Sequence, residues 1–128
     1  MKVGVVNETY PGELRVALVP DIVGQLAKKG FDVVIEAVAG VSAGYADAGY
    51  EAKGAQVVAS RKEVFDAADI IAQVRSAGAN PDGCQADFDL MREGQIIVGA
   101  AEPLGRPDLV AKMAETKVSS FGLELIPR

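Results

Sequence analysis

Short runs of β-branched and other apolar residues alternate along this chain with segments whose apolar residues have helical spacing. The clearest run lies within residues 31–36, where Val33, Val34 and Ile35 are consecutive, a pattern typical of a strand covered on both faces. Further runs lie at residues 2–6, 56–59, 69–74, 95–98 and 118–123. This alternation is typical of βαβ units. We therefore predict an α/β fold, a Rossmann-like (flavodoxin-like) three-layer domain with a mostly parallel sheet of about six strands, the last of them buried.

Signals for helix ends occur between these runs. Pro20 suits a first helical turn and Gly30 suits a helix end, while Ser60 and Glu63 have the spacing of a capping box. The polar residues 76–84 are predicted to be the longest irregular loop. Helices are predicted at residues 21–29, 47–53, 88–92 and 106–116, with a further one around Val64 and Phe65.

The chain has 128 residues and a net charge of −5. A chain of this length forms one domain, or a part of one, and buries roughly two thirds of its unfolded surface. The acidic balance argues against a nucleic-acid or anionic-membrane surface, and the sequence lacks the run of about 18 apolar residues that a membrane span needs. Residues 1–6 have the pattern of a strand rather than of a secretion signal. We therefore predict a cytoplasmic location without direct membrane insertion.

The sequence contains no histidine and a single cysteine, Cys84. One thiol excludes an internal disulfide. Without histidine, the Ser-His-Asp and Cys-His mechanisms and the common zinc sites are absent. We predict neither a catalytic residue nor a metal site in this chain, and we expect Cys84 to be a spectator. Tyr10, Tyr45 and Tyr50 are predicted to be half-buried anchors of loops rather than catalytic groups.

Charged residues follow several of the predicted strands. Arg15 lies in the loop after the first strand, Arg75 ends the fourth, Glu102 follows the fifth and Arg128 follows the sixth. Because ligands of open α/β sheets bind beyond the carboxyl ends of the strands, these residues predict a polar cleft there. A guanidinium suits a carboxylate or a phosphate, and Arg15 is expected to be buried. Three of these residues also have an alternative to a role in the cleft. Arg15 could pair with Glu13 or Glu8 and only fix the loop, and Arg75 and Glu102 could be charges that face solvent.

Residues 40–44 form a glycine-rich stretch with the spacing G-x-x-x-G. A dinucleotide fingerprint has the pattern G-x-G-x-x-G between the first strand and the first helix, where its glycines let the backbone approach a pyrophosphate. The stretch here follows the second strand, and the chain has no Gly-Lys-Ser/Thr of a P-loop. A structural turn and a substrate-facing loop both remain open for this stretch, and the sequence lacks the phosphate cradle.

Residues 13–20 (ELRVALVP) and 123–128 (LELIPR) are the most specific of several segments that match a known pattern over residues 1–128. The supporting segments are residues 1–5, 30–33, 39–44, 50–55 and 93–95. Together these segments resemble the amino-terminal domain shared by alanine dehydrogenases and the alpha subunit of proton-translocating NAD(P) transhydrogenase. The resemblance implies that residues 1–128 are one amino-terminal domain, a fragment of a longer chain whose domain with the NAD fingerprint is missing here.

The two branches of that family imply different roles for the candidate residues. In alanine dehydrogenases, an arginine that matches Arg15 binds the substrate carboxylate, a lysine stands where this chain has Arg75, and a histidine falls near residues 99–101, where this chain has none. A guanidinium does not readily shuttle a proton. These departures favour the transhydrogenase branch, in which hydride passes directly between two nicotinamides and needs no acid–base residue. In that branch, Arg128 matches the first arginine of a loop that contacts the nicotinamide end of NAD(H).

The transhydrogenase branch implies hydride transfer from NADH to NADP⁺ coupled to proton translocation. NAD(H) would bind mainly outside this chain, with Arg128, and as further candidates Arg15 and Arg75, in contact with it; NADP(H) would bind to a partner component. The implied partners are a second copy in a homodimer and the membrane-embedded and NADP(H)-binding components, which place the domain on the cytoplasmic side of the inner (cytoplasmic) membrane. The 128-residue piece alone is expected to be inactive.

Two other functions remain alternatives. One is an amino-acid dehydrogenase similar to alanine dehydrogenase or saccharopine dehydrogenase, and the other is a free-standing module that binds a small ligand.

Overall fold

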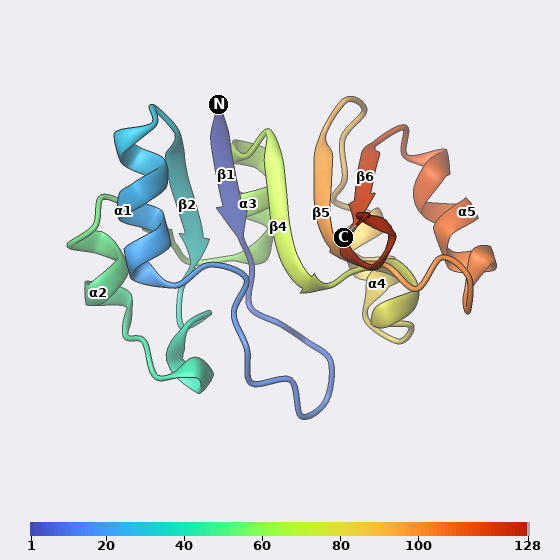
Figure 1. The fold of residues 1–128 in the computed structure, drawn as a ribbon, viewed down its shortest axis with the longest axis horizontal. Coiled ribbons are helices and arrows are strands. Elements are labelled where there is room, and N and C mark those ends of the chain that lie inside the picture. The colour runs from blue at the N-terminus through green and yellow to red at the C-terminus, as the bar shows by residue number, and fades with distance from the viewer. Residues whose placement is uncertain (128) are drawn as a thin grey trace.

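The sheet has the strand order β3-β2-β1-β4-β5-β6, and every neighbouring pair of strands is parallel (Figure 1). The computed structural model describes residues 1–127. From β1 the chain moves outward to β3, returns to β4 beside β1, and moves outward again to β6. The predicted α/β fold with a parallel sheet is therefore confirmed, and its topological switch point lies between β1 and β4. The strands of the described residues are β1 (Lys2–Val5), β2 (Asp32–Glu36), β3 (Gln56–Val58), β4 (Ile70–Arg75), β5 (Ile96–Ala100) and β6 (Ser119–Gly122).

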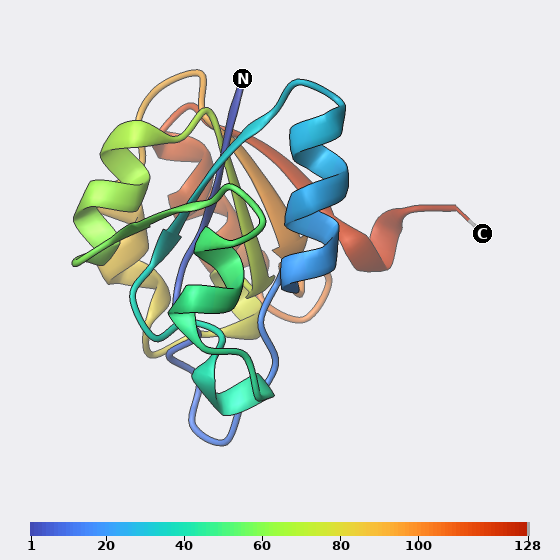
Figure 2. The ribbon, with the colours of Figure 1, turned by 90° about the vertical axis from the view of Figure 1, so that its left-hand side faces the viewer.

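Helices lie on both faces of this sheet. On one face α1 packs against β2 and α2 against β3, and on the other face α3 packs against β1, β2 and β3. Figure 2 shows the sheet between α1 and α3, which is the predicted three-layer arrangement. The helices are α1 (Pro20–Lys28), α2 (Asp47–Glu51), α3 (Arg61–Ala67), α4 (Cys84–Phe88) and α5 (Pro107–Glu115), with one-turn 3₁₀ helices η1 (Val41–Ala43), η2 (Ala77–Ala79) and η3 (Leu123–Leu125).

One row of side chains across the sheet shows how far the layer of α1 and α2 extends. Aligned residues of parallel strands point to the same face, and Val5 and Ile35 in the middle of the row are fully buried. At the end of the row, Phe121 is 56% exposed. The helices of residues 1–127 thus cover this face over β1 to β3 and leave it open over β4 to β6. From β3 to β6 the row consists of Val57, Ile35, Val5, Ala72, Val98 and Phe121.

The opposite face packs closely against α3. Val64 of α3 and Ile71 of β4 are fully buried in the same apolar cluster. Between them lies Gly4 of β1, where an added Cβ would be 2.7 Å from both Val64 Cγ1 and Ala68 Cβ. A residue without a Cβ is therefore required at this position for α3 to approach the sheet so closely.

The start of α3 agrees with its predicted signal. Ser60 Oγ accepts a hydrogen bond from Glu63 N (3.3 Å), and Glu63 Oε2 accepts one from Ser60 N (2.8 Å). The capping box predicted from the spacing of these two residues is confirmed.

The segment between β4 and β5 differs from the prediction. The helix predicted at residues 88–92 was wrong, because α4 begins at Cys84 and ends at Phe88. Cys84 N donates a hydrogen bond to Asn80 O (2.9 Å) in the turn that precedes this helix. Residues 76–83 do connect β4 to α4 as an irregular segment that contains η2, but the prediction that this loop is the longest was wrong, because residues 6–19 between β1 and α1 form a longer one. Residues 76–80 are buried. Their small side chains allow this burial: at Gly78 an added Cβ would lie 2.6 Å from Arg106 Cβ.

The last strand was predicted to be buried, and this prediction was wrong. Ser119, Ser120 and Phe121 of β6 are all exposed. The reason is that β6 is an edge strand of the sheet, and no helix of the described residues covers one of its two faces. After β6, the final described residues extend away from the sheet on the side of α1 (Figure 2).

Candidate functional site

The loop between β1 and α1 brings Glu13 to the carboxyl end of β4, where its carboxylate joins two arginines. Glu13 Oε1 accepts hydrogen bonds from Arg15 N (3.0 Å) and Nε (2.8 Å). Glu13 Oε2 accepts from Arg15 Nη2 (2.8 Å) and from Arg75 Nε (2.8 Å). The hydrogen bonds from Arg15, and after them that from Arg75, hold the pKa of the Glu13 carboxyl well below its usual range.

Arg75 is fixed by further contacts. Its guanidinium carbon lies 4.2 Å from the centroid of the Tyr10 ring, a distance typical of a cation–π contact, and Nη1 lies 3.5 Å from Ala79 O. Within residues 1–127, neither Arg75 Nη2 nor Arg15 Nη1 donates a hydrogen bond. Each guanidinium therefore has donors left for a ligand.

Glu8 fastens the same loop to β4. Its Oε1 accepts a hydrogen bond from Val74 N (2.7 Å) and its Oε2 accepts one from Arg75 N (3.1 Å). Burial raises the pKa of the Glu8 carboxyl. Of the two carboxylates considered as partners of Arg15, Glu13 is the one that pairs with it, whereas Glu8 binds the backbone of β4.

A cleft of about 560 Å³ lies beside these residues, at the carboxyl ends of β4 and β5. It opens over the half of the sheet that no helix of the described residues covers, next to the switch point, where open α/β sheets bind ligands. Of the residues predicted to meet at a cleft, Arg15, Arg75 and Glu102 line it. Its other lining residues are Val16, Ala17, Leu18, Ala72, Gln73, Val74, Ala79, Val98, Ala100 and Leu123.

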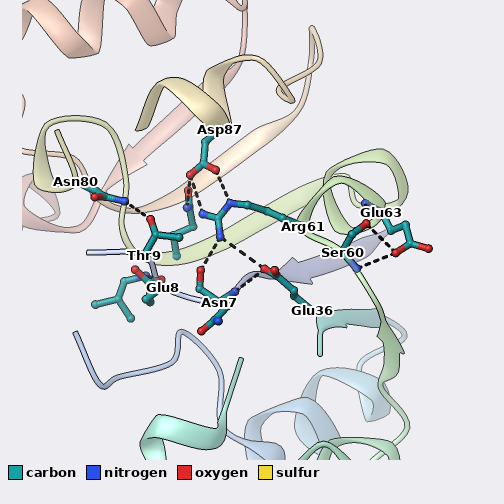
Figure 3. A network of polar contacts seen from close by, with 11 residues as sticks. Asn7, Glu8, Thr9, Glu36, Ser60, Arg61, Glu63, Asn80 and Asp87 are labelled. Atoms are coloured by element: carbon teal, nitrogen blue, oxygen red, sulfur yellow. Dashed lines mark hydrogen bonds and ion pairs between the residues drawn. The ribbon is translucent and has the colours of Figure 1, made fainter. Parts of the chain in front are cut away.

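A second polar cluster supports the same strand ends from the α3 side (Figure 3). Arg61, the first residue of α3, donates from Nε (2.5 Å) and Nη2 (2.9 Å) to Asp87 and from Nη1 to Asn7 O. Gln73 Nε2 also donates to Asp87 (2.8 Å), whose side chain is 3% exposed. Asp87 thereby ties α4 to α3 and β4, and Arg61 extends these contacts to the loop after β1. Gln73 Oε1 is buried and has no hydrogen-bond partner within residues 1–127.

The outcomes for the predicted arginines differ. Arg15 was predicted to be buried, and this was wrong: its side chain is 67% exposed, because Glu13 (4% exposed) takes the inner position. The side chain of Arg75 is 32% exposed. Arg128 lies outside the described residues.

The tyrosines and Cys84 have structural surroundings. Tyr50 was predicted to be half buried but is fully buried, because its hydroxyl donates to Leu18 O (2.9 Å) and its ring lies in the core. Tyr10 and Tyr45 are 37% and 39% exposed. Cys84 is buried, and this burial raises the pKa of its thiol, which does not favour a reactive thiolate.

The glycine-rich stretch forms a tight turn away from the cleft. It contains η1, and Gly44 follows with a φ of 91°, a conformation that favours glycine. At Gly40 an added Cβ would lie 2.5 Å from the ring of Tyr50. These close contacts favour the structural-turn alternative, since none of these residues lines the cleft.

Three residues at these strand ends were not predicted to belong to the site. Tyr10 stacks on Arg75, and Gln73 and Asp87 belong to the supporting cluster. A polar glutamine within the apolar run of β4 was the one available signal, because buried polar groups are normally hydrogen-bonded.

No helix formed by residues 1–127 is both long enough and apolar enough to cross a membrane. The same residues contain no group of three or more Cys, Asp or Glu side chains placed to hold a metal ion.

The fold and the cleft define a Rossmann-like α/β domain that carries a site with two arginines beside its switch point. The chain belongs to the alanine dehydrogenase/PNT N-terminal domain family, whose pattern matches residues 4–128. This finding confirms the resemblance found in the sequence.

Known relatives come from both branches of the family. The chain is 35% identical over 128 residues to the NAD(P) transhydrogenase subunit alpha of Cereibacter sphaeroides, covering 100% of this chain and 23% of that protein. The crystal structure of transhydrogenase from Sinorhizobium meliloti is 31% identical, with a TM-score of 0.89 over 100% of this chain and 36% of that one. An L-alanine dehydrogenase structure is 30% identical, with a TM-score of 0.86 over 95% of this chain and 32% of that one. This chain thus spans about a quarter to a third of the length of these relatives.

Proposed function

We propose that this chain is the amino-terminal part of the NAD(H)-binding component of a proton-translocating NAD(P) transhydrogenase, which transfers hydride from NADH to NADP⁺. The observation that carries the proposal is the pair of permanently charged arginines in a cleft of a chain without histidine. Hydride transfer between two nicotinamides needs binding and orientation but no proton shuttle, and a guanidinium supplies the first two and not the third.

The cleft fits one end of a nicotinamide nucleotide rather than the whole cofactor. Its mainly apolar walls suit a planar ring, and the remaining donors of Arg15 and Arg75 suit phosphate or carboxamide oxygens. The sequence has no G-x-G-x-x-G to cradle a pyrophosphate. The main NAD(H) site therefore lies in a further domain, and when bound the cofactor supplies the hydride chemistry while this chain orients it.

Several partners belong to the same proposal. A second copy of the chain would form a homodimer, and separate components would hold NADP(H) and cross the membrane. The domain would then lie on the cytoplasmic side of that membrane, and the 128-residue piece alone would be inactive. The similarity of the whole chain to transhydrogenase alpha subunits supports this assignment.

The experiment that tests the proposal follows hydride itself in the intact protein with its partner components. NADH deuterated at the transferred position of C4 is mixed with NADP⁺, and the label in NADPH is measured by mass spectrometry. We expect deuterium to appear in NADPH without exchange with water. Reduction of NAD⁺ by L-alanine, without label transfer between the nucleotides, would instead establish the amino-acid dehydrogenase alternative, which the likeness to L-alanine dehydrogenase supports.

Arg128 carries a separate prediction of this proposal. Arg128→Ala in the intact protein is expected to slow hydride transfer about tenfold or more, since it removes a group proposed to position the nicotinamide, and to leave the thermal midpoint unchanged. A loss of folded protein without a specific loss of rate would show that Arg128 is structural.

A further inference from the structure

Glu13 differs from the partner in an ordinary surface ion pair. Its side chain is almost completely buried, although it lies in a loop, and its two oxygens accept four hydrogen bonds. By contrast, the side chains of Lys62 and Asp66, which form an ion pair within α3, are 68% and 53% exposed. The donors to Glu13 belong to two residues that lie far apart in the sequence, Arg15 and Arg75.

The contacts of Glu13 decide which atoms of each arginine remain available. Arg15 uses Nε and Nη2 on the carboxylate, so that Nη1 is left. Arg75 uses Nε on the same carboxylate and has Nη1 near Ala79 O, so that Nη2 is left. Because one carboxylate sets both orientations, the two remaining donors keep one spacing in the cleft.

Glu13 also compensates the charge of the pair. Two guanidiniums that share one carboxylate carry a net charge of +1, whereas without that carboxylate two like charges would face each other and separate. The exposed side chain of Arg15 would then be free to turn toward solvent.

We propose that Glu13 is a positioning residue, which holds Arg15 and Arg75 together so that their remaining donors meet the acceptor oxygens of one bound nicotinamide nucleotide. This inference rests on the proposed function. Glu13 itself does not contact the nucleotide. The nucleotide binds to the two arginines because of their relative geometry and not only because of their charge.

The test is Glu13→Gln in the intact protein. If Glu13 positions the arginines, the KM for NADH rises about tenfold while kcat changes less, because ground-state contacts are lost. If Glu13 only lowered the positive charge, removing its charge would strengthen the attraction for the anionic nucleotide and lower the KM. An unchanged or lowered KM overturns the proposal.

Glu102→Gln is the matched control. Glu102 lines the same cleft, is exposed, and forms no ion pair within residues 1–127. The substitution makes the same change in charge without touching either guanidinium, so it measures the effect of charge alone. A KM increase in Glu102→Gln equal to that in Glu13→Gln would overturn the positioning role.

A double-mutant cycle identifies the route of the effect. If Glu13 acts through Arg75, Glu13→Gln adds little to the KM of an Arg75→Gln protein, whereas independent roles would multiply the two effects.

If Glu13→Gln does not fold, Glu13→Asp carries the test. This variant keeps the charge, but its side chain is too short to join both arginines, so the KM for NADH should still rise. An unchanged KM contradicts the proposal. Wild-type protein that transfers no hydride would overturn the proposed function instead.

Discussion

Tyr50 joins the segment before α1 to the core: its hydroxyl donates to Leu18 O, and its ring is buried in the core. We predict that Tyr50→Phe lowers the free energy of unfolding by about 1 kcal/mol, because Leu18 O loses its hydrogen bond with Tyr50 Oη. Urea unfolding at neutral pH measures the change. Tyr45→Phe is the control, since Tyr45 is partly exposed and its substitution should change the free energy by less than about 0.5 kcal/mol.

The same hydroxyl makes the contribution of Tyr50 to the stability of the fold dependent on pH. Burial raises the pKa of Tyr50 from 10.0 to about 12. Because the folded state holds this proton more tightly than the unfolded state, the stabilising contribution is complete below pH 10 and is lost as the pH rises toward 12. The difference in stability between wild type and Tyr50→Phe should therefore shrink over that range, and a constant difference would contradict this origin.

The candidate site was partly predictable residue by residue. Arg15, Arg75 and Glu102 could be placed at one cleft because each follows a strand and parallel strands end at the same edge. The bridge from Glu13 to Arg75 could not be predicted, since it depends on the path of a loop that contains Gly12 at a φ of 81°. Nor could sequence spacing reveal the contact between Gln73 and Asp87, because it joins different elements.

At the scale of elements, the contact between β1 and α3 depends on the absence of a side chain. We predict that Gly4→Ala lowers the free energy of unfolding by about 1–3 kcal/mol, because the added methyl group would overlap Val64 and Ala68. Thermal or urea unfolding tests this.

Gly24 in α1 is the matched comparison for Gly4. The atom nearest to an added Cβ there is Lys53 Cδ, at 3.5 Å, which is ordinary contact. Gly24→Ala should therefore stabilise the protein by roughly 0.5–1 kcal/mol through helix propensity and a less flexible unfolded chain. Equal effects at the two glycines would show that the packing of α3 is not the cause.

Elements with a complete local signal were predicted well, and those that depend on their surroundings were not. The capping box at Ser60 and the proline at the start of α1 are local, and both helices begin where expected. The exposure of β6 is not a local property: Phe121 is apolar, as are the residues of the inner strands, but it is exposed because β6 lies at the edge of the sheet. The position of α4 was missed because small residues in η2 allow the preceding segment to be buried.

At the scale of the molecule, an apolar surface continues from the open half of the sheet to the last described residues. Phe121, Leu123, Leu125 and Ile126 are each about half exposed, and adjoining apolar residues of this kind bind hydrophobic dyes. We predict that the 128-residue chain enhances the fluorescence of ANS and that Phe121→Ser reduces the enhancement. The free energy of unfolding should change by less than about 0.5 kcal/mol, as is usual for surface substitutions. If Phe121→Ser enhanced ANS fluorescence as much as the wild type does, the dye would bind to a different surface.

The overall architecture was predictable because the repeat of strand and helix is regular and parallel crossovers have one hand. What the pattern left undecided was the strand order, and with it the position of the switch point beside Arg75.

The position of β1 between β2 and β4 also determines when this chain is vulnerable during synthesis. Lys2 N donates to Asp69 Oδ2 across 67 positions of sequence, and contacts so distant form slowly because a long loop must close first. On the ribosome, one edge of β1 stays unpaired until β4 has emerged, and an unpaired strand edge is a template for aggregation. Chaperone binding and premature pairing between nascent chains are therefore expected to peak before residue 75 leaves the exit tunnel.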